Sequence, residues 1–197
     1  MKGNNSFGTR NLVLLALLTA IVVVLQALAA ALPIYPFTLT LVLVPMVIGA
    51  ALVGTLAGGW LGLVFGLVVL LSGNANLFLA VNPFATILVV IVKGALAGLV
   101  SGAVYKLLAA KSKTIATIAA AIVCPIVNTG IFVAGCYAFF LPTITEWATG
   151  ADFVNATAFI FLGMIGFNFV FEFVINIVLS PIIVRLIQYG QDKRSNV

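Results

Sequence analysis

Few residues in this chain carry functional groups that could do chemistry, and three of them fall at one depth within long apolar segments. Lys93 lies thirteen residues before Lys106, and Glu172 lies thirteen residues before Arg185. Each separation corresponds to about 20 Å along a helix, and Asn128 lies ~21 Å from the start of its own segment. A charged group inside a bilayer costs at least about 2.5–3.5 kcal/mol, so such groups usually serve a function. The spacing predicts one polar layer built from three helices.

Further polar and aromatic residues flank this layer. Asn168, Glu172 and Asn176 recur at four-residue spacing, which places them on one helix face. Segments 33–36, 72–83 and 141–155 are predicted loops that open on the outer side. These loops contribute Tyr35, Asn74, Asn76, Asn82 and Trp147. Together these residues predict a pocket lined by amides and aromatic rings, which suits a small, water-soluble, partly planar or amide-bearing ligand.

The same residues also admit a structural interpretation. Lys93 and Glu172 could form an ion pair inside the bundle, and the asparagines could form hydrogen bonds between helices. The two interpretations can hold together. If Lys93 binds a ligand, its replacement by alanine should abolish binding and leave the protein folded.

Catalytic and metal chemistry are not indicated. The chain has no histidine, which removes the commonest general base and metal ligand. Ser101 and Lys93 lie eight residues apart, or ~12 Å of helical rise, which is too far for a serine–lysine pair. Cys124 and Cys136 fall in one apolar segment and are predicted to be buried small apolar residues. We therefore expect no catalytic residue and no metal site.

The elements that must position these residues are apolar helices. Of 197 residues, 64% are hydrophobic and 7% are charged, whereas soluble domains carry about 25% charged residues. A membrane-spanning helix needs about 20 apolar residues. We expect an all-α integral membrane bundle of six transmembrane helices, which forms a single domain over residues 1–197 in the cell membrane. The predicted helices are about 11–31, 37–53, 58–71, 84–108, 114–140 and 157–188.

Basic residues predict how the bundle is oriented. Lysines and arginines precede the first helix, follow the fourth and end the chain, and with an even number of spans these positions share one side. The opposite side carries Glu146 and Asp152. The positive-inside rule then places both termini in the cytoplasm. The net charge of +5 is thus a topology signal, and we expect no nucleic-acid partner.

Small residues recur at four-residue intervals on three helices, which places each set on one helix face. Helices in lipid associate through such faces because small residues let two backbones approach closely. Each stripe therefore predicts either packing inside the bundle or a surface that docks another membrane protein. The candidates for a partner interface are Ala16 and Ala20 on the first helix and Gly58, Gly62 and Gly66 on the third, and the fourth helix carries Gly94, Gly98 and Gly102.

The chain resembles one known family in its size, its six predicted spans, its cytoplasmic termini, its three outer loops and two motifs. The motifs are Ala16-x-x-x-Ala20 and a fourth helix that reads Asn82-Pro83-Phe84, then Lys93-Gly94, then Tyr105-Lys106. Over nearly its whole length, the chain is similar to the substrate-binding S components of energy-coupling factor (ECF) vitamin transporters.

The resemblance implies a division of labour. An S component captures a vitamin outside the cell and docks on a membrane T component that works with two cytoplasmic ATPases, and Ala16 and Ala20 would face that T component. The partners would use ATP, and this chain would hold no cofactor and would be no enzyme. The lack of a G-x-x-x-x-G-K-[ST] phosphate loop agrees with this.

The sequence constrains the identity of the substrate less than it constrains the family. Pantothenate comes first, because its carboxylate could bind Lys93 and its amide and hydroxyl groups could bind the asparagines. Glu172 counts against pantothenate, since it could already neutralise Lys93. Riboflavin, pyridoxine-like or hydroxymethylpyrimidine compounds, folate and cobalamin stay open. The alternative function is a stand-alone secondary transporter of a small polar solute, although such folds usually consist of repeated halves and no convincing repeat is visible here.

Overall fold

The computed structural model describes residues 8–31 and 42–195, except for the side chains of residues 167, 168, 180 and 190–195. Every regular element in these residues is helical, so the all-α prediction is confirmed there. Two of the segments, η1 and η2, are π-helical. In chain order the elements are α1 (Thr9–Ala31), α2 (Leu43–Leu52), α3 (Thr55–Leu71), α4 (Asn76–Val81), α5 (Pro83–Ala109), α6 (Lys113–Gly135), η1 (Cys136–Phe140), α7 (Leu141–Gly150), α8 (Ala156–Ala158), η2 (Phe159–Ile165) and α9 (Gly166–Ser195).

Three helical stretches in the described part of the chain are long and apolar enough to cross a membrane. They are Thr9–Ala31, Pro83–Ala109 and Lys113–Gly150, and the bent pair of Ala156–Ile165 and Phe169–Leu179 would make a fourth span. α2 has 10 residues and α3 has 17, which correspond to about 15 and 25 Å and fall short of a hydrocarbon core of ~30 Å. The predicted count of six spans is therefore not confirmed, and residues 37–41 of the predicted second helix lie outside the described residues.

Two segments predicted to be loops contain helices. α4 occupies part of the predicted loop 72–83. The predicted helix 114–140 comprises α6 and η1, and α7 follows directly within the predicted loop 141–155. Pro142 falls in the first turn of α7, where its missing N–H is not needed. The predicted helix 157–188 contains η2 and continues in α9.

The starts of α5 and α6 are set by side-chain caps. Asn82 Oδ1 accepts a hydrogen bond from the backbone N–H of Ala85 at 3.1 Å, and Pro83 follows at the first helical position. Ser112 Oγ accepts a hydrogen bond from the backbone N–H of Ile115 at 3.3 Å. These caps fix where each helix begins and therefore how far along it the polar residues of the middle turns lie.

The glycine stripes of α3 and α5 pack against each other, and this contact is among the most extensive in the fold. A Cβ atom on Gly58 would lie 2.6 Å from the backbone oxygen of Gly98, and one on Gly62 would overlap the carbonyl of Gly94. Since the obstructing atoms belong to the backbone, no side chain can move aside to make room.

This packing corrects one assignment made from the sequence. Gly58, Gly62 and Gly66 are buried against α5, so this stripe is not available to a partner. Of the two interpretations of the stripe, the structure favours packing within the chain's own bundle.

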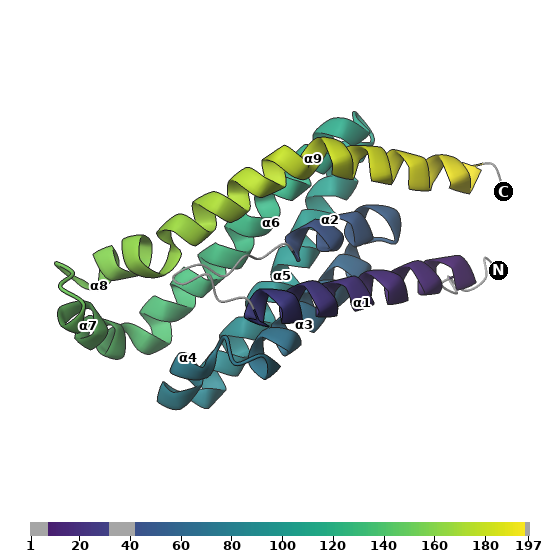
Figure 1. Ribbon diagram of the computed structural model, residues 1–197. Helices are drawn as coiled ribbons and strands as arrows, with labels where there is room; N and C mark the ends of the chain where they lie inside the picture. The colour runs from purple at the N-terminus through teal and green to yellow at the C-terminus, as the bar shows by residue number, and fades with distance from the viewer. Residues whose placement is uncertain (1–7, 32–41, 196–197) are drawn as a thin grey trace.

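The bundle has two chemically different ends. α5 and α6 run antiparallel and α3 lies against α5, while α4, α7 and α8 gather at the end opposite the start of α1 and the end of α9 (Figure 1). Basic residues occur at the start of α1, around the α5–α6 turn and in α9, namely Arg10, Lys106, Lys111, Lys113 and Arg185. Glu146 and Asp152 belong to α7 and to the segment that follows it. The charge asymmetry predicted from the sequence therefore coincides with the two ends of the fold.

Candidate functional site

A cavity of about 450 Å³ lies among α1, α3, α4, α5, α6, α7, α9 and the two π-helical segments. Its volume falls in the ~300–1,000 Å³ range of small-molecule sites. Residues of α4, α7 and η2 contribute to its wall, so it lies in the half of the bundle away from the chain termini (Figure 1). This position makes it the natural place to look for the predicted pocket.

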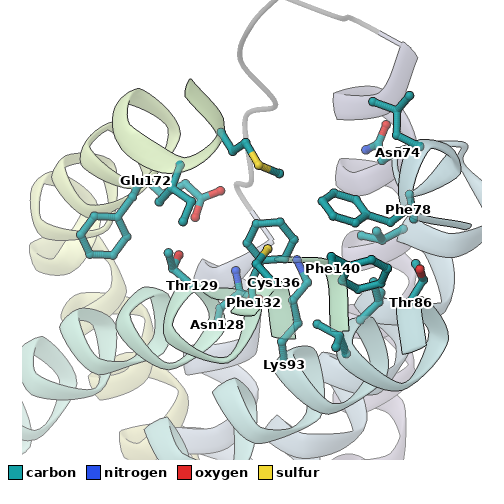
Figure 2. Close-up of a pocket in the computed structure, with 18 of the residues that line it drawn as sticks. Asn74, Phe78, Thr86, Lys93, Asn128, Thr129, Phe132, Cys136, Phe140 and Glu172 are labelled. Carbon is teal, nitrogen blue, oxygen red and sulfur yellow. The ribbon is translucent and has the colours of Figure 1, made fainter. Parts of the chain in front are cut away.

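The cavity brings together five of the nine residues predicted to form a site. They are Asn74, Lys93, Asn128, Trp147 and Glu172. Figure 2 shows Glu172, Thr129 and Asn128 on one side in this view, Phe78, Phe140 and Thr86 on the other, and Lys93, Phe132 and Cys136 between them.

Of the other four predicted residues, two lie away from the cavity and two fall outside what the structure describes. Asn82 is exposed and caps α5, and Asn76 is exposed on α4; neither lines the cavity. Tyr35 and the side chain of Asn168 lie outside the described residues. The capping role of Asn82 shows that an asparagine followed by proline at a helix start is explained by local structure alone.

Lys93 is held in the cavity by aromatic rings. Its Nζ atom lies 5.2 Å from the ring centroid of Phe132 and 5.9 Å from that of Phe65, which are cation–π distances. The buried carboxyl group of Glu172 comes from α9 on another wall of the same cavity. The cavity therefore presents an amine and a carboxyl group to whatever enters it.

Two amide side chains in the wall have unsatisfied oxygen atoms. Gln26 is 3% exposed and Asn128 is 6% exposed, yet Gln26 Oε1 and Asn128 Oδ1 have no hydrogen-bond partner within the described residues. Leaving such a group unpaired costs about 1–3 kcal/mol. Protein interiors rarely keep such atoms unpaired, so these two amides are retained at a cost in stability.

The rest of the wall is rich in aromatic rings. Among the described residues, seven aromatic side chains line the cavity, namely Phe65, Phe78, Phe132, Phe140, Trp147, Phe159 and Phe169. Phe78 makes edge-to-face contacts with three of them, at centroid distances of 5.7 Å to Phe132, 4.9 Å to Phe140 and 5.6 Å to Trp147. We call Phe78, Phe132, Phe140 and Trp147 the aromatic wall.

Both π-helical segments contribute to the lining. Cys136 and Phe140 come from η1, and Phe159, Gly163 and Met164 come from η2. A π-helical turn inserts an extra residue and changes which side chains point to one face, and such turns are common at functional sites. Here they turn side chains of two long helices toward one cavity.

Several lining residues were missed by reasoning from the sequence. Gln26 carried a usable signal, because it is an amide inside the first apolar helix, as Asn128 is inside the fifth predicted helix. No such signal marked Thr86, Thr129 or most of the phenylalanines. Apolar and weakly polar residues are equally expected to face lipid or other helices. Only the fold separates those that line the cavity from those that do not.

Metal chemistry finds no support in the part of the chain that the structure describes. No group of three or more potential metal ligands occurs there. Cys124 and Cys136 are buried free cysteines, as predicted. The volume and the mixed polar and aromatic lining of the cavity are those of a binding site for a small molecule.

Comparison with known proteins assigns the chain to a family. The family model "ECF transporter, substrate-specific component" matches residues 10–184. No curated protein and no solved structure matches the chain. Proteins of this family are membrane-embedded subunits of transporters and not enzymes. The match covers nearly the whole chain, so the chain belongs to the family of ECF transporter substrate-specific components.

Proposed function

We propose that the chain is the high-affinity substrate-capture subunit of an ATP-driven ECF importer in the cell membrane. In this proposal it binds a small water-soluble vitamin in the cavity and docks on a membrane T component that works with two cytoplasmic ATPases. The partners use ATP, and this chain supplies the binding site. Its membership in the family of substrate-specific components supports this division of labour.

The observation that carries the proposal is the polar chemistry of the cavity. The amide oxygens of Gln26 and Asn128 are buried there without partners among the described residues, and Lys93 adds a cation. A scaffold that binds nothing would gain by replacing these groups with apolar side chains, because each unpaired group lowers stability. A ligand that contacts these side chains, which line the cavity, gives them a reason to be present.

The distribution of charge supports a site that opens outside the cell. The basic residues lie at the α5–α6 turn, in α9 and at the start of α1, and the positive-inside rule assigns such regions to the cytoplasm. The half of the bundle with α4, α7 and α8 would then face outward. A capture subunit needs its empty site on that side.

Pantothenate is the candidate predicted from the sequence, and Lys93 does line the cavity, where a carboxylate could pair with it. Riboflavin, pyridoxine-like compounds, hydroxymethylpyrimidine and folate stay in the panel. Cobalamin fits least well, because a cavity of about 450 Å³ suits a ligand of drug size or smaller.

Isothermal titration of the purified full chain in detergent tests the proposal. The panel is pantothenate, riboflavin, pyridoxine, hydroxymethylpyrimidine and folate. We expect tight one-to-one binding of one compound, and loss of that binding in Lys93→Ala while gel filtration and thermal unfolding show a folded protein. If folded wild-type protein binds none of the five, the capture function is wrong. Uptake by the chain alone under an ion gradient would then indicate a secondary transporter.

Docking is proposed to use Ala16 and Ala20, which are exposed on α1. Leucine at both positions would hold a partner's backbone away from this face. We expect A16L/A20L to bind ligand as the wild type does and to lose uptake in cells that contain the T component and the ATPases. Ile21→Phe adds bulk elsewhere on the exposed side of α1 and should keep uptake. Full uptake by A16L/A20L would remove this pair from the interface.

A further inference from the structure

The amine of Lys93 faces the cavity with N–H groups that have no acceptor in the described part of the chain. Its Nζ atom lies over the rings of Phe132 and Phe65, and no hydrogen bond or ion pair joins it to a residue that the structure describes. Rings hold the amine in place but do not accept its hydrogens as an oxygen or a nitrogen lone pair would. A ligand that occupies the cavity can supply that acceptor.

Asn128 adds a second donor. Its Oδ1 atom is enclosed and without a partner among the described residues, whereas the side chain lines the cavity. The part of this amide that can meet a ligand is therefore its NH2 group, which also makes no hydrogen bond to a described residue. Figure 2 shows the nitrogen atoms of Asn128 and Lys93 directed toward the open space between the walls.

The two donors approach the same face of α6. Lys93 Nζ lies 5.2 Å from the ring centroid of Phe132, and Asn128 precedes Phe132 by four residues. Residues at this spacing are neighbours on a helix, with Cβ atoms about 5–6 Å apart. One edge of a small molecule can therefore meet both donors at once, and that edge must carry two acceptors.

The aromatic wall begins at the same place. Phe132, which carries the amine of Lys93 over its ring, also contacts Phe78 edge to face, and Phe78 contacts Phe140 and Trp147 in turn. Such rings pair best with another planar ring, by offset stacking or by edge-to-face contact. A flexible chain gains less from this wall, because it must lose rotational freedom to lie against it.

We propose that the substrate is a planar heteroaromatic ring system that carries a carbonyl oxygen beside a ring nitrogen lone pair, with these two acceptors bound by Lys93 Nζ and Asn128 Nδ2 and the ring packed on the aromatic wall. This rests on the proposed function and narrows it. Folate and riboflavin have such an edge. Pantothenate has acceptors but no ring, pyridoxine has no ring carbonyl, and hydroxymethylpyrimidine places a donor amine beside its ring nitrogen.

The test removes one acceptor from the ligand without changing its shape. In the deaza analogues, C–H replaces the ring nitrogen beside the carbonyl. They are 5-deazafolate for folate, and 5-deazariboflavin and 1-deazariboflavin for riboflavin, which has such a nitrogen on each of two edges. We expect the full wild-type chain to bind folate or riboflavin most tightly in the panel. One deaza analogue of that compound should bind about tenfold to a hundredfold more weakly, because a buried donor then loses its acceptor.

Variants then show which donor meets the ring nitrogen. Asn128→Leu and Lys93→Met each remove one donor and keep much of the volume. In one of them the same deaza substitution should weaken binding by less than about threefold, because its partner is already gone. If one variant does not fold, the other still assigns the nitrogen. Gln188→Leu changes an exposed amide of α9 outside the cavity and should keep the full penalty.

The outcomes separate this inference from the proposed function. If pantothenate, pyridoxine or hydroxymethylpyrimidine binds most tightly, the proposed ring edge is wrong and the capture function stands. If no deaza analogue binds more weakly, or if the penalty is the same in wild type and in every folded variant of Asn128 and Lys93, the pairing of the ring edge with these donors is wrong. If nothing in the panel binds to folded protein, the capture function itself is wrong.

Discussion

The α3–α5 interface and the cavity share one helix and use it in opposite ways. On one face of α5, Gly94 and Gly98 lie so close to α3 that a Cβ atom on either would overlap backbone. The residue next to Gly94 is Lys93, which points into an open cavity (Figure 2). Close packing holds α5 in place, and the helix can therefore carry a charged side chain into a space that nothing in the described chain fills. Rigidity on one face supports a cavity-lining lysine on the other.

The largest loss of stability is expected when the glycine face between α3 and α5 is filled. Gly62→Leu would place a side chain on the Gly94 carbonyl, and because backbone cannot rotate away, we expect a loss of about 3 kcal/mol or more. That corresponds to a fall of roughly 6–12 °C in the thermal unfolding midpoint of the purified protein. Ligand binding should weaken as well, since α5 carries Lys93.

Gly130→Ala is the matched control, because nothing lies within 4 Å of a Cβ atom at this exposed position of α6. Its midpoint should stay the same or rise slightly, since alanine is the better helix former. Equal midpoints for Gly62→Leu and Gly130→Ala would show that the α3–α5 interface is not closely packed.

A smaller and opposite change in stability is expected when an amide with an unpaired oxygen is removed from the cavity wall. Asn128→Leu replaces a buried amide whose oxygen lacks a partner among the described residues, so the ligand-free protein should gain about 1–2 kcal/mol, or roughly 2–8 °C in midpoint. Binding should weaken in the same variant. A lower midpoint would instead support the structural interpretation, in which the asparagine joins two helices. Gain of stability with loss of binding is the pattern of a group kept for function.

The smallest effect is expected in the aromatic wall. Phe78→Leu removes three edge-to-face contacts, each worth about 0.5–1.5 kcal/mol beyond burial. Because leucine still fills much of the space and keeps part of this energy, we expect about a tenfold loss of affinity by titration and a fall of about 3 °C in midpoint. Phe84→Leu changes a ring of α5 that is 79% exposed and should leave both quantities unchanged. Equal affinities of the two variants would contradict a role for the wall.

The fold was predictable in segments where the length of an apolar run alone identifies a helix. Continuous apolar runs identify α1 and α5 as helices long enough to cross a membrane. α2 begins at Leu43, and the predicted start of this helix at residue 37 is not tested, because residues 37–41 lie outside the described part of the chain. The π-helical turns η1 and η2 were not predictable, since no residue type marks them in the sequence.

The residues of the candidate site were predictable where they are polar and lie within an apolar helix, because such residues are rare in a bilayer unless they have a role. Lys93, Asn128 and Glu172 stand out because a polar residue in an apolar helix is costly, and all three line the cavity. Asn76 and Asn82 stand in a predicted loop, where polarity carries no such cost, and neither lines the cavity. The phenylalanines were missed because their side chains suit lipid, core and pocket equally well.

The most direct test of the central claim, that ligand binds in this cavity, uses the two tryptophans of the chain. Trp147 lines the cavity, whereas Trp60 is 49% exposed on α3 and donates through Nε1 to Thr19 Oγ1 at 3.2 Å. The compound that binds in the titration panel is added to Trp60→Phe and to Trp147→Phe while tryptophan emission is recorded. We predict a saturable change in Trp60→Phe and none in Trp147→Phe. A change that persists in Trp147→Phe and vanishes in Trp60→Phe would place the ligand at α1 and α3 and contradict the account.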